Sequence, residues 1–149
     1  MAPGSDMEHP LLGHLEYEED LNWYTAKVTV DGRTADLRIH CGSRTDSHSE
    51  PPALAHAVRF VATIDRLCQT AKECAVRDLL GLKNDDWRGD DEPEVDVGEF
   101  KRLMEIEGIV VHGDGSAEFY YQDGDLFWGH AILVYMRADG RFGNASLAG

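Results

Sequence analysis

The sequence predicts an α+β domain. An antiparallel sheet is built from an N-terminal hairpin and a C-terminal four-strand meander, and it is covered on one face by one long and one short helix. Two patterns predict this fold. Asp-Gly dipeptides, which tolerate the positive φ angles of hairpin turns, each lie between strand-like segments. A stripe of apolar residues at steps of three and four marks the long helix. The dipeptides are Asp31-Gly32, Asp114-Gly115, Asp123-Gly124 and Asp139-Gly140.

The N-terminal hairpin joins Trp23–Val30 to Arg33–Cys41. Apolar and polar residues alternate along its first strand, which is typical of a sheet with one buried face. A shorter strand near His14–Tyr17 extends the sheet. We expect residues 1–149 to form a single domain in which residues 1–12 are a flexible N-terminal tail.

The long helix is predicted over Ala53–Leu80, after a polar loop at Gly42–Pro52. Its apolar face is expected to pack against a sheet, and Gly81 is a suitable residue to end the helix. The acidic stretch Lys83–Val95 that follows predicts an exposed loop, with Trp87 as its anchor into the core.

A short helix begins after Asp96, because an Asp N-cap with Glu99 three residues later is a helix-start signal. It is predicted to continue through Glu105 and to end at Gly108. The meander strands are then predicted at Ile109–His112, Ala117–Gln122, Asp125–Met136 and Arg141–Leu147. A free edge strand at either end of the meander could pair with a second copy, which makes a homodimer an expectation.

The charge of the chain restricts its partners. It carries 28 acidic and 14 basic residues, a net charge of −14. This charge disfavours nucleic acid and anionic membranes as partners, because both would be repelled. It permits a basic protein partner, and the alternative is that the acidity only keeps the protein soluble.

The cysteines and the N-terminus predict a cytoplasmic protein. Cys41, Cys68 and Cys74 form no Cys-x-x-Cys pair, so neither a zinc site nor a redox dithiol is indicated. Sparse, reduced thiols fit a reducing compartment. The N-terminus has no signal-peptide pattern, and no apolar run approaches the roughly 20 residues that span a bilayer.

The run from Phe119 to His130, with its Asp-Gly-Asp-x-Phe-Trp-Gly-His core, resembles a bacterial family of uncharacterised proteins, domain of unknown function family 2262. Trp23-Tyr24, Asp86-Trp87 and Glu99-Phe100 are further matching landmarks, so the resemblance covers almost the whole chain. It implies an α+β domain with no assigned activity. Small acidic domains of related kind occur among immunity proteins of bacterial toxin systems, which is an analogy.

Asp123, Asp125 and His130 are the tightest cluster of metal-competent residues. On an extended strand His130 would lie about 17 Å from Asp125 and on the opposite face. We therefore assign no metal and no cofactor, and interpret the two aspartates as turn residues. His130 is interpreted as a core histidine, and the alternative is a catalytic base.

Phe127 and Trp128 are predicted to point to opposite faces of the sheet. One should meet the helices, and the other is either covered by loops or exposed as a partner-binding surface. The acidic loop Asp85–Glu94 could mimic nucleic-acid phosphates in the basic cleft of a partner, or it is simply solvated.

Two functions follow from these observations. The first is a non-enzymatic protein-interaction domain, immunity-like in character, that binds a basic partner. The alternative is a small enzyme or ligand-binding domain that uses His130 with a neighbouring acid. We assign no catalytic residue, because no nucleophile, base and orienting group can be assembled from the sequence. The candidate functional residues are Trp87, Asp123, Asp125, Phe127, Trp128 and His130.

Overall fold

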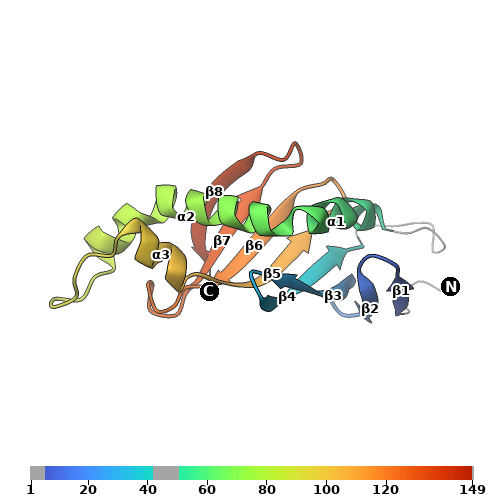
Figure 1. Cartoon of the computed structure of the whole chain (residues 1–149), viewed down its shortest axis with the longest axis horizontal. Helices are drawn as coiled ribbons and strands as arrows, with labels where there is room; N and C mark the ends of the chain where they lie inside the picture. The colour runs from blue at the N-terminus through green and yellow to red at the C-terminus, as the bar shows by residue number, and fades with distance from the viewer. Residues whose placement is uncertain (1–5, 42–50, 149) are drawn as a thin grey trace.

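The computed structural model describes residues 6–41 and 51–148, and Figure 1 shows the arrangement of their elements. Eight strands form one sheet in which the spatial order is the sequence order. The strands are β1 (Met7–His9), β2 (Gly13–Glu18), β3 (Trp23–Val30), β4 (Arg33–His40), β5 (Glu105–Val111), β6 (Ala117–Gln122), β7 (Ala131–Met136) and β8 (Phe142–Ala148). The helices are α1 (Pro52–Ala62), α2 (Ile64–Asp86) and α3 (Val97–Leu103).

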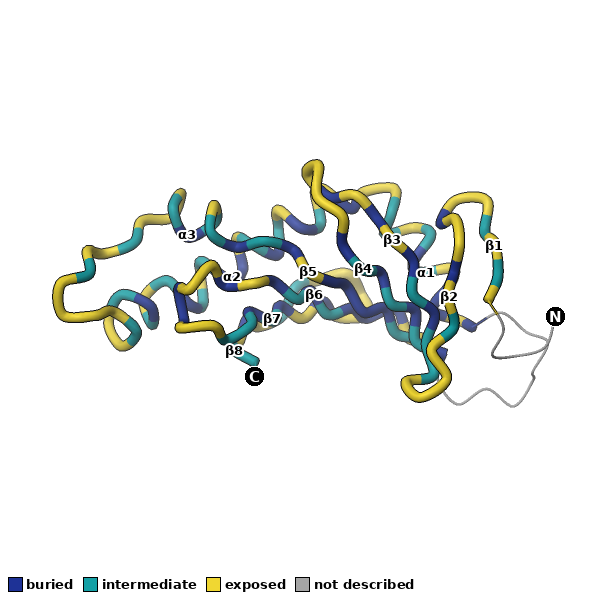
Figure 2. The backbone as a smooth tube through the Cα atoms, turned by 90° about the horizontal axis from the view of Figure 1, so that it is seen from below, coloured by how far each residue is buried: buried dark blue, intermediate teal, exposed yellow. Residues whose placement is uncertain are grey.

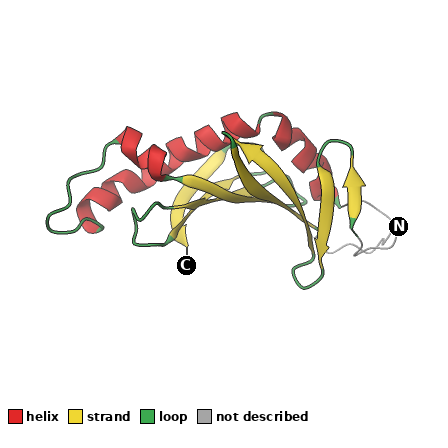
Figure 3. Ribbon diagram, turned by 60° about the horizontal axis from the view of Figure 1, so that its bottom comes forward, coloured by secondary structure: helices red, strands yellow, loops and turns green. Residues whose placement is uncertain are grey.

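The sheet is antiparallel throughout its described strands, except that β4 and β5 run parallel. Parallel neighbours need a crossover connection, and the three helices between β4 and β5 provide it. The helices therefore lie on one side of the curved sheet, as Figure 3 shows, and leave its other face open. The predicted α+β class and its covered sheet are confirmed.

The core lies between the helices and the covered face of the sheet. Strand alternation sends one set of side chains there, and the register aligns them: Leu37 pairs with Ile109, and Phe119 pairs with Val134. All four are fully buried. The remaining side chains of each strand point to the open face. Burying one large aliphatic or aromatic side chain contributes roughly 2 kcal/mol, so the buried rows of the strands contribute strongly to the stability of the fold.

The prediction of one long helix over Ala53–Leu80 agrees with the observed start at Pro52, but it is wrong in its middle and at its end. Thr63 leaves the helical region (φ −129°, ψ 28°) and separates α1 from α2. Gly81 does not end the helix, and α2 continues to Asp86. Glycine disfavours a helix interior by about 1 kcal/mol, which the tertiary contacts of the following turn outweigh.

The predicted strand Asp125–Met136 begins only at Ala131. Asp125 (φ 67°) and Trp128 (φ 57°) adopt left-handed backbone conformations, which no strand permits. The strand parity inferred for Phe127, Trp128 and His130 is therefore wrong.

The first meander strand, β5, begins at Glu105 instead of Ile109 and contains a bulge between Ile106 and Gly108. The short helix α3 accordingly ends at Leu103, before the predicted Glu105. Because β5 pairs with β4, it is not an edge strand, and the edges of the described sheet are β1 and β8.

Two predicted segments fall partly outside the described residues. Within residues 1–12, for which the sequence predicts a tail, Met7–His9 form β1 and pair with β2, while residues 1–5 are outside the description. Most of the predicted loop Gly42–Pro52 is outside it too. Across the described residues, no helix has the length and apolar character needed to cross a membrane.

Candidate interaction site

A tightly bonded turn, residues 123–130, connects β6 to β7 and is called here the Trp128 turn. The buried carboxylate of Asp123 accepts hydrogen bonds from three backbone N–H groups within it. The donors are Asp125 N at 3.1 Å, Phe127 N at 2.8 Å and Gly129 N at 3.0 Å. One side chain thus satisfies three backbone donors that would otherwise lack sheet partners. The interpretation of Asp123 as a turn residue agrees with this geometry.

The Trp128 turn is docked against the end of α3. A Cβ atom placed on Gly124, whose φ is 58°, would lie 2.5 Å from the carbonyl oxygen of Leu103. Only glycine fits that approach and that backbone conformation at once. The turn is therefore held from inside by Asp123 and from outside by the helix end.

This backbone separates the two adjacent aromatic residues. Phe127 is completely buried, and its ring meets Phe100 edge-on with centroids 6.1 Å apart. Trp128 leaves 62% of its surface exposed. A left-handed conformation is rare for a bulky residue, because its Cβ crowds the backbone. The turn thus holds an indole ring outward in a strained conformation, which is a signature of functional sites.

Trp87 joins the Trp128 turn to the end of α2. Its ring centroid lies 4.7 Å from that of Trp128, 5.7 Å from that of Phe127 and 5.3 Å from that of His130. Trp87 is half-buried and packs against the core, as expected of an anchor. The aromatic residues Trp87 and Trp128 therefore form one continuous, partly exposed surface.

The acidic loop, residues 85–94, extends from this aromatic surface. It contains six acidic residues and one basic residue. Figure 2 shows the connection between α2 and α3 projecting at one end of the molecule, with most of its residues exposed. The predicted exposed loop Lys83–Val95 is wrong at its start, because Lys83–Asp86 belong to the last turn of α2 and Lys83 is buried.

Two side chains of α2 give the acidic loop a defined shape. Lys83, of which only 1% is exposed, donates from Nζ to the carbonyl oxygen of Trp87 at 2.5 Å and to Glu92 Oε2 at 2.6 Å. Asn84 donates to the carbonyl oxygen of Val95 at 3.0 Å and accepts from Val95 N at 2.8 Å. Lys83 lowers the pKa of the Glu92 carboxyl through this hydrogen bond, which favours the ionised form of Glu92 in the folded protein.

The sequence reasoning missed Lys83 and Asn84. A usable signal exists for Lys83, which lies four residues after buried Leu79 and so continues the apolar stripe of α2. A lysine at a core position is rarely buried unless it is paired. That spacing indicates a partner carboxylate or carbonyl group nearby.

The surroundings of His130 differ from those of a catalytic base. Its Nδ1 lies 3.0 Å from the carbonyl oxygen of Phe127, and its ring packs edge-on against Trp87. Within the described chain, none of its contacts is with a carboxylate. These contacts fit the predicted structural histidine, although it is half-buried and lies at the end of a turn.

The structure brings Trp87, Phe127, Trp128 and His130 together. Asp123 fixes the backbone of the turn that carries the last three. Asp125 is exposed on the outer side of the turn, where it lines a shallow pocket with Glu94 and Glu99. Among the described residues, no three His, Cys, Asp or Glu side chains are grouped as a metal ion would require. What the arrangement offers chemically is an aromatic contact surface with an acidic border.

Comparison with known proteins gives one match over almost the whole chain. The family model described as an uncharacterized protein conserved in bacteria (DUF2262) matches residues 9–147. Methylenetetrahydrofolate reductase 2 of Schizosaccharomyces pombe is 30% identical over 89 residues, which cover 58% of this chain. The chain spans 13% of the length of that curated relative. No solved structure matches.

Proposed function

This chain belongs to the DUF2262 family of uncharacterised bacterial proteins, and we propose that it is a non-enzymatic interaction domain that binds a basic protein. The contact surface consists of the exposed Trp128 ring, the adjacent Trp87 ring and the acidic loop. The single observation that carries the proposal is Trp128, which is 62% exposed on a turn built to hold it outward.

An exposed tryptophan on a rigid turn is well suited to anchor a partner. Tryptophan is enriched among the few residues that carry most of the binding free energy of an interface. Because Asp123 and Gly124 fix the backbone of the turn, little conformational entropy remains to be lost on binding. The half-buried Trp87 beneath it extends the apolar contact area without adding a mobile side chain.

The acidic loop supports a basic partner in particular. Its exposed acidic residues lie beside the aromatic surface. Their negative charge would attract a basic partner at long range, and the aromatic rings would then make the close contact. Lys83 and Asn84 hold the ends of the loop, which keeps its charges in a fixed arrangement. A basic toxin domain or nuclease neutralised by this protein is the immunity-like version of this proposal.

The enzymatic alternative finds less support. It requires an acid beside His130, and the described contacts of His130 are with a carbonyl oxygen and an aromatic ring. The reductase activity named for the curated relative is not extended to this chain, because the match spans 13% of that protein.

The proposal is tested by capturing partners from the source bacterium with the full chain and measuring the affinity of each purified partner. We expect a basic protein whose binding weakens as salt is raised, because attraction between exposed charges is screened. Trp128→Asn should weaken binding at least tenfold, since loss of an anchoring aromatic residue commonly exceeds that value. Asn tolerates the left-handed backbone, so the turn itself should be retained.

Matched controls separate this surface from general effects. Tyr135→Asn removes an aromatic residue that is 41% exposed on β7, outside the proposed contact, and should leave the affinity unchanged. Glu19→Gln with Asp20→Asn removes two acidic residues from the β2–β3 turn and should act likewise. Equal affinity of the Trp128→Asn variant, or an affinity insensitive to salt, would contradict the proposal.

A further inference from the structure

A second candidate site lies on the open face of the sheet, beneath the β1–β2 hairpin. An open cavity of about 570 Å³ is lined there by side chains of β2, β3 and β4 and by the adjoining turns. This volume is within the usual range for small-molecule sites. In Figure 1 the strands β2–β4 and the acidic loop are at opposite ends of the molecule, so the cavity is separate from the proposed contact surface.

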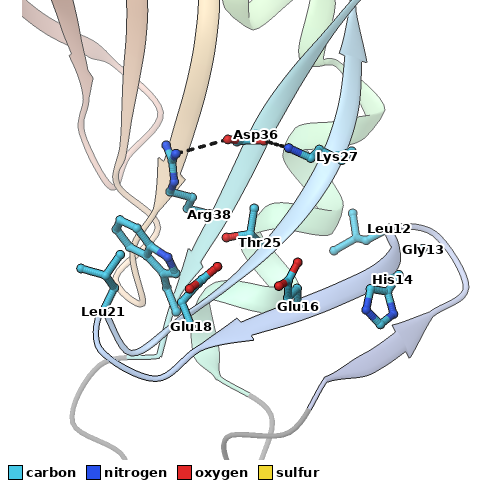
Figure 4. A pocket seen from close by; sticks show the side chains of 11 residues that line it. Leu12, Gly13, His14, Glu16, Glu18, Leu21, Thr25, Lys27, Asp36 and Arg38 are labelled. Atoms are coloured by element: carbon cyan, nitrogen blue, oxygen red, sulfur yellow. Dashed lines mark hydrogen bonds and ion pairs between the residues drawn. The ribbon is translucent and has the colours of Figure 1, made fainter.

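Strand register places one row of three side chains across the cavity. Glu16 of β2 pairs with Thr25 of β3, and Thr25 pairs with Arg38 of β4. All three belong to the lining of the cavity. The small Thr25 side chain forms the floor, and Glu16 and Arg38 stand on its two sides, with Cα atoms roughly 10 Å apart across two strand spacings. Figure 4 shows Thr25 between the two charged residues.

Two neighbours hold the Arg38 guanidinium in place, and a third leaves room for it. It lies over the indole ring of Trp23, with 5.3 Å between the carbon Cζ and the ring centroid. Its NH2 group donates to Asp36 Oδ2 at 3.2 Å. Its NH1 group lies 2.7 Å from where a Cβ atom of Gly108 would be, so only glycine leaves it this position. Side-chain entropy has therefore been lost before any ligand arrives.

Arg38 retains hydrogen-bonding capacity. A guanidinium offers five N–H donors in a planar fork that matches a carboxylate, and the described contacts engage one of them with Asp36. Asp36 also pairs with Lys27, so one carboxylate serves two cations. This side of the cavity carries an excess of positive charge within a strongly acidic molecule.

The opposite side of the cavity is negative. Glu16 and Glu18 point to the same face from alternate positions of β2, and both are exposed. Within the described residues, neither carboxylate makes a hydrogen bond or an ion pair. Apolar groups also line the cavity, among them Trp23 and the half-exposed Leu21. The Trp23 indole Nε1 is buried without an acceptor in the described chain.

We propose that this cavity binds a small zwitterion, a free amino acid or dipeptide, with its carboxylate on Arg38 and its ammonium group on Glu16 and Glu18. Opposite charges on the two sides of one cavity complement a ligand that carries both charges at its ends. The apolar groups of the lining would contact the ligand's carbon skeleton. A ligand lacking either charge would leave one side of the cavity unpaired.

The test is a titration of the full chain with each of the twenty L-amino acids and with alanyl dipeptides, followed through the indole N–H signals in NMR spectra. The Trp23 signal is assigned by its loss in Trp23→Phe. We expect saturable shifts of this signal for at least one probe. For that probe, the corresponding amine without a carboxylate and the acid without an amino group should each bind at least tenfold more weakly.

Three variants locate the site. Arg38→Gln and Glu16→Gln should each weaken binding at least tenfold. Gly108→Ala keeps every charge but displaces the guanidinium, and it should weaken binding as well. The matched control is Arg33→Gln, which removes an arginine from the other end of β4, where it pairs with Glu105 at 2.9 Å, and should leave the affinity unchanged.

Amino-acid or dipeptide binding that is lost in Arg38→Gln and Gly108→Ala but kept in Arg33→Gln supports the proposal, as long as the variants give native-like NMR spectra. Absence of saturable shifts with every probe overturns it. Equal binding of the deaminated acid overturns the zwitterionic part, because an anion alone would then suffice.

Discussion

Asp123 is the residue on which the Trp128 turn depends most. Its carboxylate accepts three backbone hydrogen bonds in a buried position. Asp123→Ala would leave these donors unpaired, and we expect the free energy of unfolding to fall by about 3 kcal/mol. Urea denaturation measures this change. Asp125→Asn is the control, because Asp125 is exposed and Asn tolerates its left-handed backbone.

A similar loss of stability in both variants would contradict this assignment, because it would mean that the turn tolerates no change of either aspartate. Loss of partner binding in Asp123→Ala at full stability would contradict it differently, since Asp123 would then contact the partner itself. We expect Asp123→Ala to lower both stability and affinity, because the same hydrogen bonds position Trp128.

Cys68 is buried under the sheet, and its backbone carbonyl oxygen accepts a hydrogen bond from the Tyr121 hydroxyl at 2.7 Å. Burial raises the pKa of the Cys68 thiol to about 12. The thiolate is the reactive form, so the native protein should leave Cys68 unmodified by iodoacetamide at about pH 8. Mass spectrometry of labelled peptides checks this, with urea-unfolded protein as the positive control. Rapid labelling of Cys68 in the native state would contradict its burial.

Lys83 organises the element that carries the acidic loop. Lys83→Met keeps most of the aliphatic volume but removes the bonds to Trp87 and Glu92. We expect unfolding free energy to fall by about 2 kcal/mol, because a carbonyl oxygen and a carboxylate lose their partner. Hydrogen exchange should accelerate across residues 87–95. Lys101→Met is the control, since the ion pair of Lys101 with Glu73 is loose, at 3.9 Å. Unchanged exchange in Lys83→Met would show that the loop is held without it.

The same pair predicts how the acidic loop responds to acid. The Lys83 hydrogen bond holds the pKa of Glu92 below its ordinary value of 4.5. A lowered carboxyl pKa contributes stability that is present above the ordinary value and is lost as the pH falls through the lowered one. Protection of residues 87–95 from hydrogen exchange should therefore persist at about pH 5 and disappear in stronger acid. In Glu92→Gln this acid-induced loss should be absent.

The elements differ in how well the sequence predicts them, and the differences have local causes. The hairpin β3–β4 is correctly predicted, because alternation and Asp31-Gly32 both act within a few residues. The start of β7 is not, because the conformation of Trp128 depends on a buried carboxylate and on the end of α3. Neither contact can be inferred from the alternation of apolar and polar residues. The sequence therefore predicts that one of Phe127 and Trp128 faces away from the helices, but not which one.

The candidate site follows the same rule. The sequence predicts Trp87 as an anchor because it is a large apolar residue within an otherwise polar, acidic stretch, and that signal is local. The charged row on the open sheet face was not identified. Glu16, Thr25 and Arg38 are individually ordinary residues of exposed strand positions, and only the register across three strands makes them neighbours.

At the scale of the whole molecule, the placement of charge works against stability. The net charge is −14, and the acidic loop concentrates part of it at one end. Asp85 and Asp86 lie in the last turn of α2, where the helix dipole disfavours negative charge. A protein under selection for stability alone would gain by replacing them. Under the proposed function, these unfavourable charges beside the exposed Trp128 would attract the basic partner.

This conflict between stability and binding gives a prediction that distinguishes a binding surface from a merely solvated loop. Asp85→Asn with Asp86→Asn should raise the unfolding free energy at low salt by about 1 kcal/mol, or roughly 3 °C in Tm. The gain should shrink at high salt, where repulsion is screened. The same variant should bind the captured basic partner more slowly and less tightly.

Thermal unfolding and association kinetics at low and high salt measure both effects. A variant that gains stability and keeps its full affinity would show that these charges serve solubility alone, whereas opposite changes in stability and affinity would tie the acidic end of the molecule to partner binding.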